Sequence, residues 1–289
     1  MTIIPEAVCP VGAELGEGPV WNAADRALWF VDIKAPSIHR FDPAADALRS
    51  WPAPEPVGWV LPAARGGMIA GLKSGLHHFD PVTGGFALIA AVEADRPRNR
   101  LNDAATDPEG RIWFGTMDDS EQGPSGEFYC FDRGRVSPIG LPRVRITNGP
   151  ALSPDGRTLY TVDTVAQTLH ASHVGDDGSL HSTRIFARIG EGEGFPDGPT
   201  VDSEGCVWIA LFFGWSARRY SPKGELLETV RFPVANVTKL AFGGPDLRTV
   251  YATTAKLHLK PDALERQPEA GHLFAFRSDV PGVPVTPVA

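Results

Sequence analysis

The stretch Phe195-Pro196-Asp197-Gly198-Pro199-Thr200-Val201-Asp202-Ser203-Glu204-Gly205-Cys206-Val207-Trp208 sets the pattern of the whole chain. It begins near an acidic residue followed by glycine, passes through a short apolar run and a tight polar turn, and ends in an aromatic strand. The same order recurs from Glu17, Asn102 and Asn148. We call Asp197 and its equivalents Glu17, Asn102 and Asn148 the polar heads. The aromatic residue follows 11 positions after Asp197 and Asn102, and 12 positions after Glu17 and Asn148. The sequence therefore contains an internal repeat.

Six such units are counted by the strand that follows each turn, and they recur every 40 to 50 residues or so. The six expected strands are 27–33, 68–72, 111–117, 158–163, 207–212 and 249–253. Turns of the Pro-Asp-Gly and Asp-Gly kinds precede several of them and favour hairpins. A third strand usually follows and ends in an aromatic residue. This spacing predicts an all-β, six-bladed β-propeller with four-stranded blades around a central axis.

The length of 289 residues suits one such propeller, so we expect residues 1–289 to form a single domain. A propeller has to close its ring, and we expect residues 3–14 to pair with the final strands near 272–276. A short helical insertion is expected within 260–269.

Composition narrows the classes of partner. The formal net charge is −8 and no basic stripe is present, which argues against nucleic acid and an anionic membrane. Three cysteines are too few and too far apart for a disulfide framework or a thiolate metal site. The start of the chain lacks the pattern of a secretory signal, and no run approaches the roughly 18 apolar residues of a spanning helix. We expect a cytoplasmic monomer.

The polar heads are the candidate functional residues. In a propeller the first strand of each blade lies innermost, so the heads occupy equivalent places around one rim of the axis. In chain order they are Glu17, Gly58, Asn102, Asn148, Asp197 and either Thr238 or Lys239. Glu17, Asn148 and Asp197 offer hard oxygen ligands that suit Ca²⁺, Mg²⁺, Mn²⁺ or Fe²⁺, with Zn²⁺ less typical. The alternative for each head is an ordinary turn residue that bonds its own backbone.

Five motifs, in this order along the chain, resemble the SMP-30/gluconolactonase/regucalcin family. They are Leu15–Trp21, Asn99–Asp103, Thr147–Gly149, Pro196–Gly198 and Phe242–Leu247. The resemblance implies a six-bladed propeller that hydrolyses a sugar lactone, a pentono- or hexonolactone, to the aldonic acid with one divalent metal ion. The details resemble bacterial aldonolactonases more than animal regucalcin.

The resemblance also implies roles for individual residues. The metal ligands fall on Glu17, Asn148 and Asp197, and the substrate-binding residues on Arg100, Asn102 and one of Asp118 and Asp119. The implied mechanism uses the ion as a Lewis acid that also activates a water molecule, with Asp197 as the base. Arg100 would donate to substrate hydroxyls or to the developing oxyanion. Aromatic residues that follow or adjoin the strands are candidates for the pocket wall: Trp59, Phe212, Phe213 and Trp215.

Two other functions stay open at this point. One is a binding scaffold without catalysis, since many radial repeat proteins only bind partners. The other is a regucalcin-like role in calcium binding or a promiscuous esterase activity at the same site. A serine hydrolase is disfavoured because the chain has no Gly-x-Ser-x-Gly motif.

Overall fold

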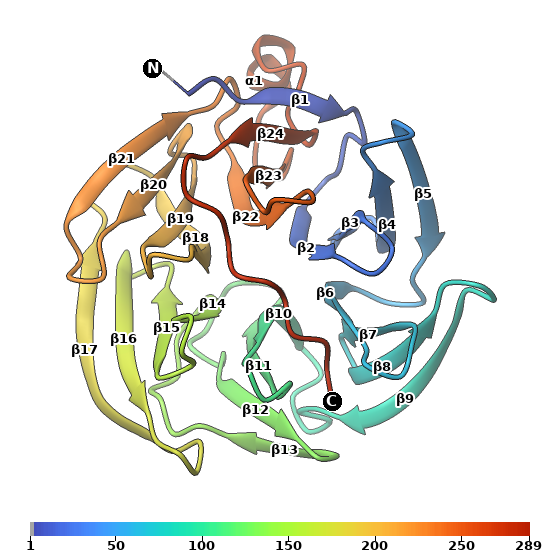
Figure 1. Ribbon diagram of the computed structural model, residues 1–289, viewed down its shortest axis with the longest axis vertical. Helices are drawn as coiled ribbons and strands as arrows, with labels where there is room; N and C mark the ends of the chain where they lie inside the picture. Colours follow the sequence, from blue (N-terminus) through green and yellow to red (C-terminus); the bar gives the residue numbers. More distant parts are fainter. Residues whose placement is uncertain (1–2) are drawn as a thin grey trace.

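The computed structural model describes residues 3–289 as a ring of six blades, each a four-stranded antiparallel sheet (Figure 1). Blades 1 to 3 consist, from the axis outward, of β2 (Gly16–Asn22), β3 (Ala27–Asp32), β4 (Ser37–Asp42) and β5 (Ala47–Pro52); β6 (Val57–Pro62), β7 (Met68–Leu72), β8 (Gly75–Asp80) and β9 (Gly85–Ala91); and β10 (Asn99–Thr106), β11 (Ile112–Asp118), β12 (Phe128–Asp132) and β13 (Arg135–Pro138).

Blades 4 to 6 continue the ring in chain order. They consist of β14 (Thr147–Leu152), β15 (Thr158–Asp163), β16 (Thr168–Val174) and β17 (Leu180–Arg188); β18 (Phe195–Val201), β19 (Val207–Phe212), β20 (Ser216–Tyr220) and β21 (Leu226–Arg231); and β22 (Val237–Gly243), β23 (Thr249–Thr254), β24 (Leu273–Arg277) and β1 (Glu6–Cys9). The helix α1 (Pro261–Arg266) lies between β23 and β24, inside the range expected for a helical insertion.

The ring closes as the sequence predicts. β1 pairs antiparallel with β24, with Glu6 opposite Ala275, so the start of the chain completes the last blade. This pairing covers an edge that would otherwise present free backbone groups. Blades 5 and 6 also touch through one parallel pair, Gly198 opposite Lys239.

The innermost strand of every blade is irregular where its head residue stands. Its register against the second strand shifts between the residue pairs Glu17/Val20, Val57/Trp59, Leu101/Ala104, Asn148/Ala151, Pro196/Pro199 and Val237/Lys239. A bulge bends a strand and redirects the side chains beside it. Gly18 and Gly149 have φ of +53° and +73°, a left-handed conformation that glycine adopts without steric cost. In blades 1 and 4 the Gly after the head thus permits the bulge that turns the head toward the axis.

The repeated turn after the head stabilises the blades. In blade 5 the buried Asp202 carboxylate accepts hydrogen bonds from the Trp208 indole at 3.0 Å and the Arg219 guanidinium at 2.7 Å. Blade 3 has the same arrangement, with Asp107 bonded to Trp113 and Arg111. Both tryptophans are almost wholly buried. This half of the repeat is therefore scaffold, as its residue types suggest.

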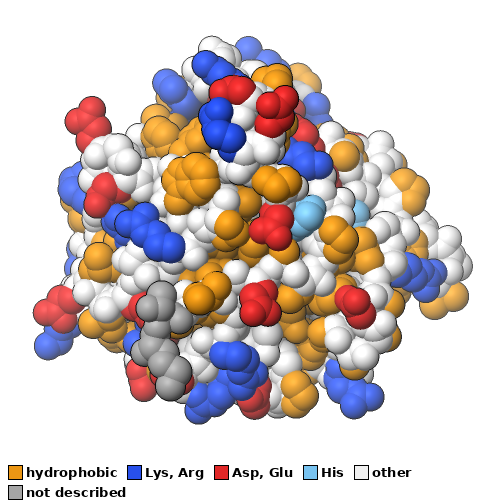
Figure 2. Space-filling model, turned by 90° about the horizontal axis from the view of Figure 1, so that it is seen from above, with side chains coloured by type: hydrophobic (Ala, Val, Ile, Leu, Met, Phe, Trp, Pro, Cys, Tyr) orange, Lys and Arg blue, Asp and Glu red, His pale blue; other side chains and the backbone are white. Residues whose placement is uncertain are grey.

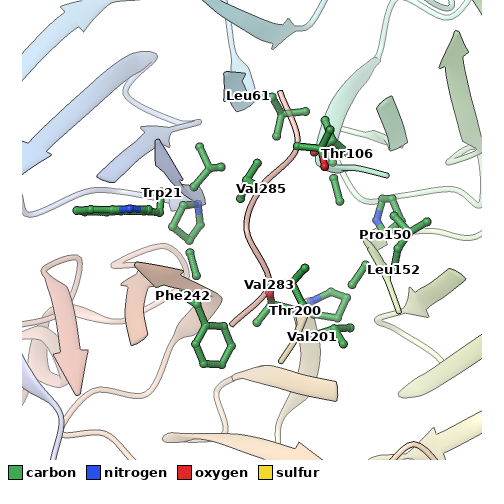
Figure 3. Close-up of a pocket in the computed structure, with 18 of the residues that line it drawn as sticks. Trp21, Leu61, Thr106, Pro150, Leu152, Thr200, Val201, Phe242, Val283 and Val285 are labelled. Carbon is green, nitrogen blue, oxygen red and sulfur yellow. The ribbon is translucent and has the colours of Figure 1, made fainter. Parts of the chain in front are cut away.

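A segment that we call the C-terminal strap, residues 279–289, crosses the axis after β24 (Figure 1). It bridges to blade 5 through Asp202 and Gly282, and to blade 2 through Ala63 and Val288. Val283 and Val285 lie over the C-terminal ends of the innermost strands (Figure 3), where they border a pocket of about 150 Å³. This end of the axis is covered by apolar side chains.

Within residues 3–289, none of the helical segments has the length and apolar character needed to span a membrane. On the face shown in Figure 2, Lys and Arg side chains alternate with Asp and Glu instead of gathering into one basic area.

Candidate active site

A second pocket, which we call the site pocket, opens at the N-terminal ends of the innermost strands, opposite the strap. Its volume is about 300 Å³. Five residues that the sequence singles out line it together: Glu17, Arg100, Asn102, Asn148 and Asp197. They come from blades 1, 3, 4 and 5 and are up to 180 positions apart. The expectation that the heads converge in space is met for these residues.

The two carboxylates of the site pocket are buried, Glu17 with 4% and Asp197 with 6% of its surface exposed. Glu17 accepts one hydrogen bond, from the Gly18 amide at 3.0 Å. Asp197 Oδ1 is buried and has no hydrogen-bond partner among residues 3–289. An unpartnered buried carboxylate oxygen is costly, and because this one faces the pocket it is available to a ligand.

The pKa values of both carboxyls reflect this crowding. Burial, then the charge of Asp103, raises the pKa of Glu17 to about 8. Burial, then the charges of Glu17 and Asp103, raises the pKa of Asp197 well above its ordinary value. The negative charge of each ionised carboxylate opposes ionisation of the other, and a bound cation would offset this repulsion.

Asn148 is oriented by its neighbours. Its Nδ2 donates to Thr164 Oγ1 at 2.9 Å, and Thr164 Oγ1 in turn donates to the Pro196 carbonyl at 2.9 Å. Its Oδ1 accepts from Asn102 Nδ2 at 3.1 Å. Because an amide oxygen has two lone pairs, Oδ1 keeps one for a further partner in the pocket.

Arg100, which also lines the site pocket, is held in place by hydrogen bonds from its guanidinium group. Its Nη1 donates to Asn102 Oδ1 at 2.6 Å and its Nε to Asp119 Oδ1 at 2.6 Å. Asp119 also accepts from Lys34 at 2.8 Å. Burial opposes ionisation of Asp119, but Lys34 and Arg100 outweigh it and hold its pKa below the ordinary value. Asp119 therefore reaches the site through Arg100, whereas Asp118 accepts bonds from Ser120 and lies beside Arg98.

The donor set fits a divalent cation. Two carboxylates and one amide oxygen from three blades face one space, with a net charge of −2 when both carboxylates are ionised. Among the described residues, no three His, Cys, Asp or Glu side chains lie together as a possible metal site, and the third donor here is an amide oxygen. Hard oxygen donors of this kind suit Ca²⁺, Mg²⁺ or Mn²⁺.

A buried ion pair between Lys239 and Asp103 lies close to Glu17 and Asp197, and the sequence pattern does not predict this pairing. Lys239 Nζ donates to Asp103 Oδ1 and, at 3.2 Å, to the Ala104 carbonyl. Asp103 Oδ2 also accepts from the Gly149 amide at 3.0 Å. Lys239 was one of two candidates for the sixth head, but Asp103 follows a head and reads as ordinary strand sequence.

The blade 2 head is glycine for a steric reason. A Cβ on Gly58 would lie 2.7 Å from the backbone oxygens of both Leu101 and Asn102. The innermost strand of blade 3 passes too closely for any side chain, so blade 2 contributes no polar group here.

The mouth of the site pocket differs in part from the expectation. Phe212 and Phe213 line it, as predicted. The prediction that Trp59 lines the site pocket is wrong. This residue is 1% exposed and borders the pocket beside the strap, at the other end of the axis. Trp215 is 41% exposed and lies outside the pocket lining.

Two polar residues at the mouth, Glu121 and His258, were not identified from the sequence. They face each other from blades 3 and 6, with Oε1 and Nε2 3.8 Å apart. Their φ values are +57° and +64°, conformations uncommon for residues with side chains. They lie in loops whose paths no repeat pattern specifies.

Fold and site together define a class: a six-bladed propeller with a cluster of hard oxygen donors and an arginine at the N-terminal end of its axis. The family model described as "SMP-30/Gluconolactonase/LRE-like region" matches residues 15–256. The chain therefore belongs to this family, as its motifs indicated.

Several relatives support this assignment. A 6-deoxy-6-sulfogluconolactonase of Pseudomonas putida is 33% identical, with 93% of this chain and 92% of that protein covered. An L-arabinolactonase of Azospirillum brasilense is 32% identical over 91% of this chain and 88% of that protein. The crystal structure of a calcium-binding regucalcin from Agrobacterium tumefaciens covers 100% of this chain and 98% of that one, with a TM-score of 0.96 and 27% identity.

Proposed function

We propose that this protein hydrolyses a sugar lactone, a pentono- or hexonolactone, to the corresponding aldonic acid with one divalent cation. The observation that carries the proposal is the buried, unpartnered Asp197 Oδ1 beside Glu17 and Asn148, with Arg100 facing the same pocket. The lactonase names of two relatives point to the same class of substrate.

Each polar residue of the site pocket has its own role in the proposed hydrolysis. Glu17, Asn148 and Asp197 would hold the cation, which would polarise the ester carbonyl as a Lewis acid and lower the pKa of a water molecule. The Asp197 carboxylate, with one oxygen toward the cation, accepts the proton of the attacking water on the other. Arg100 donates to the carbonyl oxygen as negative charge develops on it. Water adds to the carbonyl carbon, the ring C–O bond breaks, and a proton passes to the ring oxygen to give the hydroxy acid.

Asn102 acts on this arrangement from both sides. Its Oδ1 accepts from Arg100 and its Nδ2 donates to Asn148 and, at 2.6 Å, to the Thr147 carbonyl. Asn102 therefore holds the donor Arg100 and the proposed ligand Asn148 at a fixed distance from each other. Precise placement of this kind is where much of an enzyme's rate advantage arises.

The test is a panel of aldonolactones followed by pH-stat, with the metal removed by chelation and then restored. Opening rates above buffer that vanish on chelation and return with Mn²⁺ or Ca²⁺ support the proposal. Asp197→Asn, which keeps the shape of the side chain, should lower kcat/KM about 10²- to 10³-fold. Rates equal to buffer across the whole panel would refute it.

The similarity to a calcium-binding regucalcin favours a second candidate, calcium binding without catalysis. Calorimetry separates the two. Calcium binding that requires Glu17 and Asp197, with no lactone opening under any metal, supports the second candidate.

A further inference from the structure

The site pocket is divided into a polar floor and an apolar wall. The metal-binding and donor residues described above form the floor. Eight of the seventeen lining residues are apolar: Leu15, Met117, Ile146, Val165, Phe195, Phe212, Phe213 and Leu257. The pocket can thus hydrogen-bond one end of a ligand on its floor and offers mainly hydrocarbon along its wall, with Glu121, Arg145 and His258 at the mouth.

Blade 5 supplies the aromatic part of this wall. Phe195 begins β18 and stands opposite Phe212 at the end of β19. The rings of Phe212 and Phe213 meet edge to face, with centroids 4.9 Å apart. Val165 of blade 4 and Leu257 of blade 6 extend the wall on either side.

Phe213 is held in place at a cost. Its φ is +58°, a conformation that bulky residues rarely adopt, and its backbone amide donates to Asn236 Oδ1 at 3.1 Å. Even so, 40% of its surface is exposed, as is 39% of Phe195. Exposed aromatic rings on the wall of a pocket mark a surface that a ligand covers.

We infer that the substrate is a lactone whose exocyclic end is apolar, such as a terminally deoxygenated aldonolactone, rather than a fully hydroxylated one. This inference rests on the proposed function. The ester carbonyl and ring hydroxyls lie on the floor against Arg100 and Asn102, and the exocyclic carbon lies against Phe213 and its neighbours.

The energetics of a terminal hydroxyl decide between the two substrate classes. One aromatic ring can stack on the C–H face of any sugar, but this wall has several apolar side chains side by side. A hydroxyl pressed against them loses its water and gains no partner from these side chains, while Glu121 and His258 at the mouth face each other. Apolar pockets discriminate against a single added hydroxyl by about tenfold to a hundredfold.

The experiment compares a hexono-γ-lactone with its 6-deoxy counterpart of the same configuration on the metal-loaded protein. The 6-deoxy lactone should have the larger kcat/KM by about tenfold or more. Equal values, or a preference for the hydroxylated lactone, would overturn the inference while leaving lactone hydrolysis intact. If neither lactone is opened, the proposed function itself fails.

A pair of variants in one loop ties the preference to the wall. Phe213→Asn places a polar group at a position whose left-handed backbone asparagine tolerates, so the fold should persist. We expect the preference for the 6-deoxy lactone to fall to threefold or less. Trp215→Asn is the matched control, because Trp215 has a similar φ of +54° and similar exposure but lies outside the pocket lining. It should keep the preference of the unaltered protein, and a preference unchanged in Phe213→Asn would overturn the inference.

A third lactone tests an anionic end. Arg145 is exposed at the mouth of the pocket. If the 6-sulfo lactone is opened faster than the 6-deoxy lactone, Arg145 rather than the apolar wall selects the exocyclic group, and the inference is wrong.

Discussion

Binding of a divalent cation should release a proton, because the metal-free site holds one. The pKa of Glu17 is raised to about 8, first by burial and then by the charge of Asp103. At pH 6.5 this carboxyl is therefore almost entirely protonated, whereas a metal ligand must be ionised. The cation has to displace the proton, and metal affinity should fall as the pH falls.

The size of the effect follows from that pKa. Below pH 8 the apparent association constant should rise about tenfold per pH unit, or about 1.4 kcal/mol, for each proton displaced. Between pH 6.5 and pH 8.5 the ionised fraction of one group with a pKa of about 8 increases roughly 25-fold. A second proton on Asp197, whose pKa is also raised, would make the dependence steeper.

Isothermal titration calorimetry with Mn²⁺ measures this directly. The chelated protein is titrated at pH 6.5 in two buffers with different ionisation enthalpies, and the difference in observed heat gives the number of protons released. We expect the release of at least one proton per cation at pH 6.5 and of fewer at pH 9. In Glu17→Gln, which cannot ionise, binding should be weaker and the release from residue 17 should disappear. No proton release at pH 6.5, with constant affinity to pH 8.5, would refute the reasoning.

Further predictions concern stability, measured by urea denaturation. In the metal-free protein, folded Glu17 keeps a proton that the unfolded chain has lost, so the stability of the unaltered protein relative to Glu17→Gln should decrease by about 1.4 kcal/mol per pH unit from pH 4.5 to about pH 8; a stability difference that stays constant over this range contradicts the raised pKa. Lys239→Met leaves Asp103 buried without its counter-charge and should cost about 3–5 kcal/mol, part of which the added change Asp103→Asn restores. Asp202→Asn should cost a similar amount, because this carboxylate holds both an indole and a guanidinium. Deletion of residues 283–289 should cost about 2–4 kcal/mol through lost apolar contacts and hydrogen bonds, with kcat/KM unchanged because the strap lies at the other end of the axis.

The fold could be predicted from the sequence because the repeat carries its own geometry. The turn residues and the aromatic residue in each unit perform a local task, as Asp202 and Trp208 show, so their spacing is visible in the chain. The polar heads were readable for the same reason. Glu17, Asn148 and Asp197 hold one position in the repeat, and a ring brings equivalent positions together.

Contacts between blades could not be predicted in the same way. Lys239 meets Asp103 from a strand 136 positions away, and the strap meets blades 2 and 5 after the repeat has ended. Trp59 shows the limit most clearly, because its place in the sequence does not reveal at which end of the axis its ring lies. Glu121 and His258 lie close together only because two irregular loops, from blades 3 and 6, both border the mouth of the site pocket.

If the proposed function is right, lactone hydrolysis requires one cation held by Glu17, Asn148 and Asp197. The most direct test measures the initial rate of lactone opening against the measured metal content of the same samples, from fully chelated to saturated. We expect a rate that rises in proportion to occupancy, from buffer level at zero to a plateau at one ion per chain. A chelated protein that opens the lactone as fast as the saturated one would contradict it.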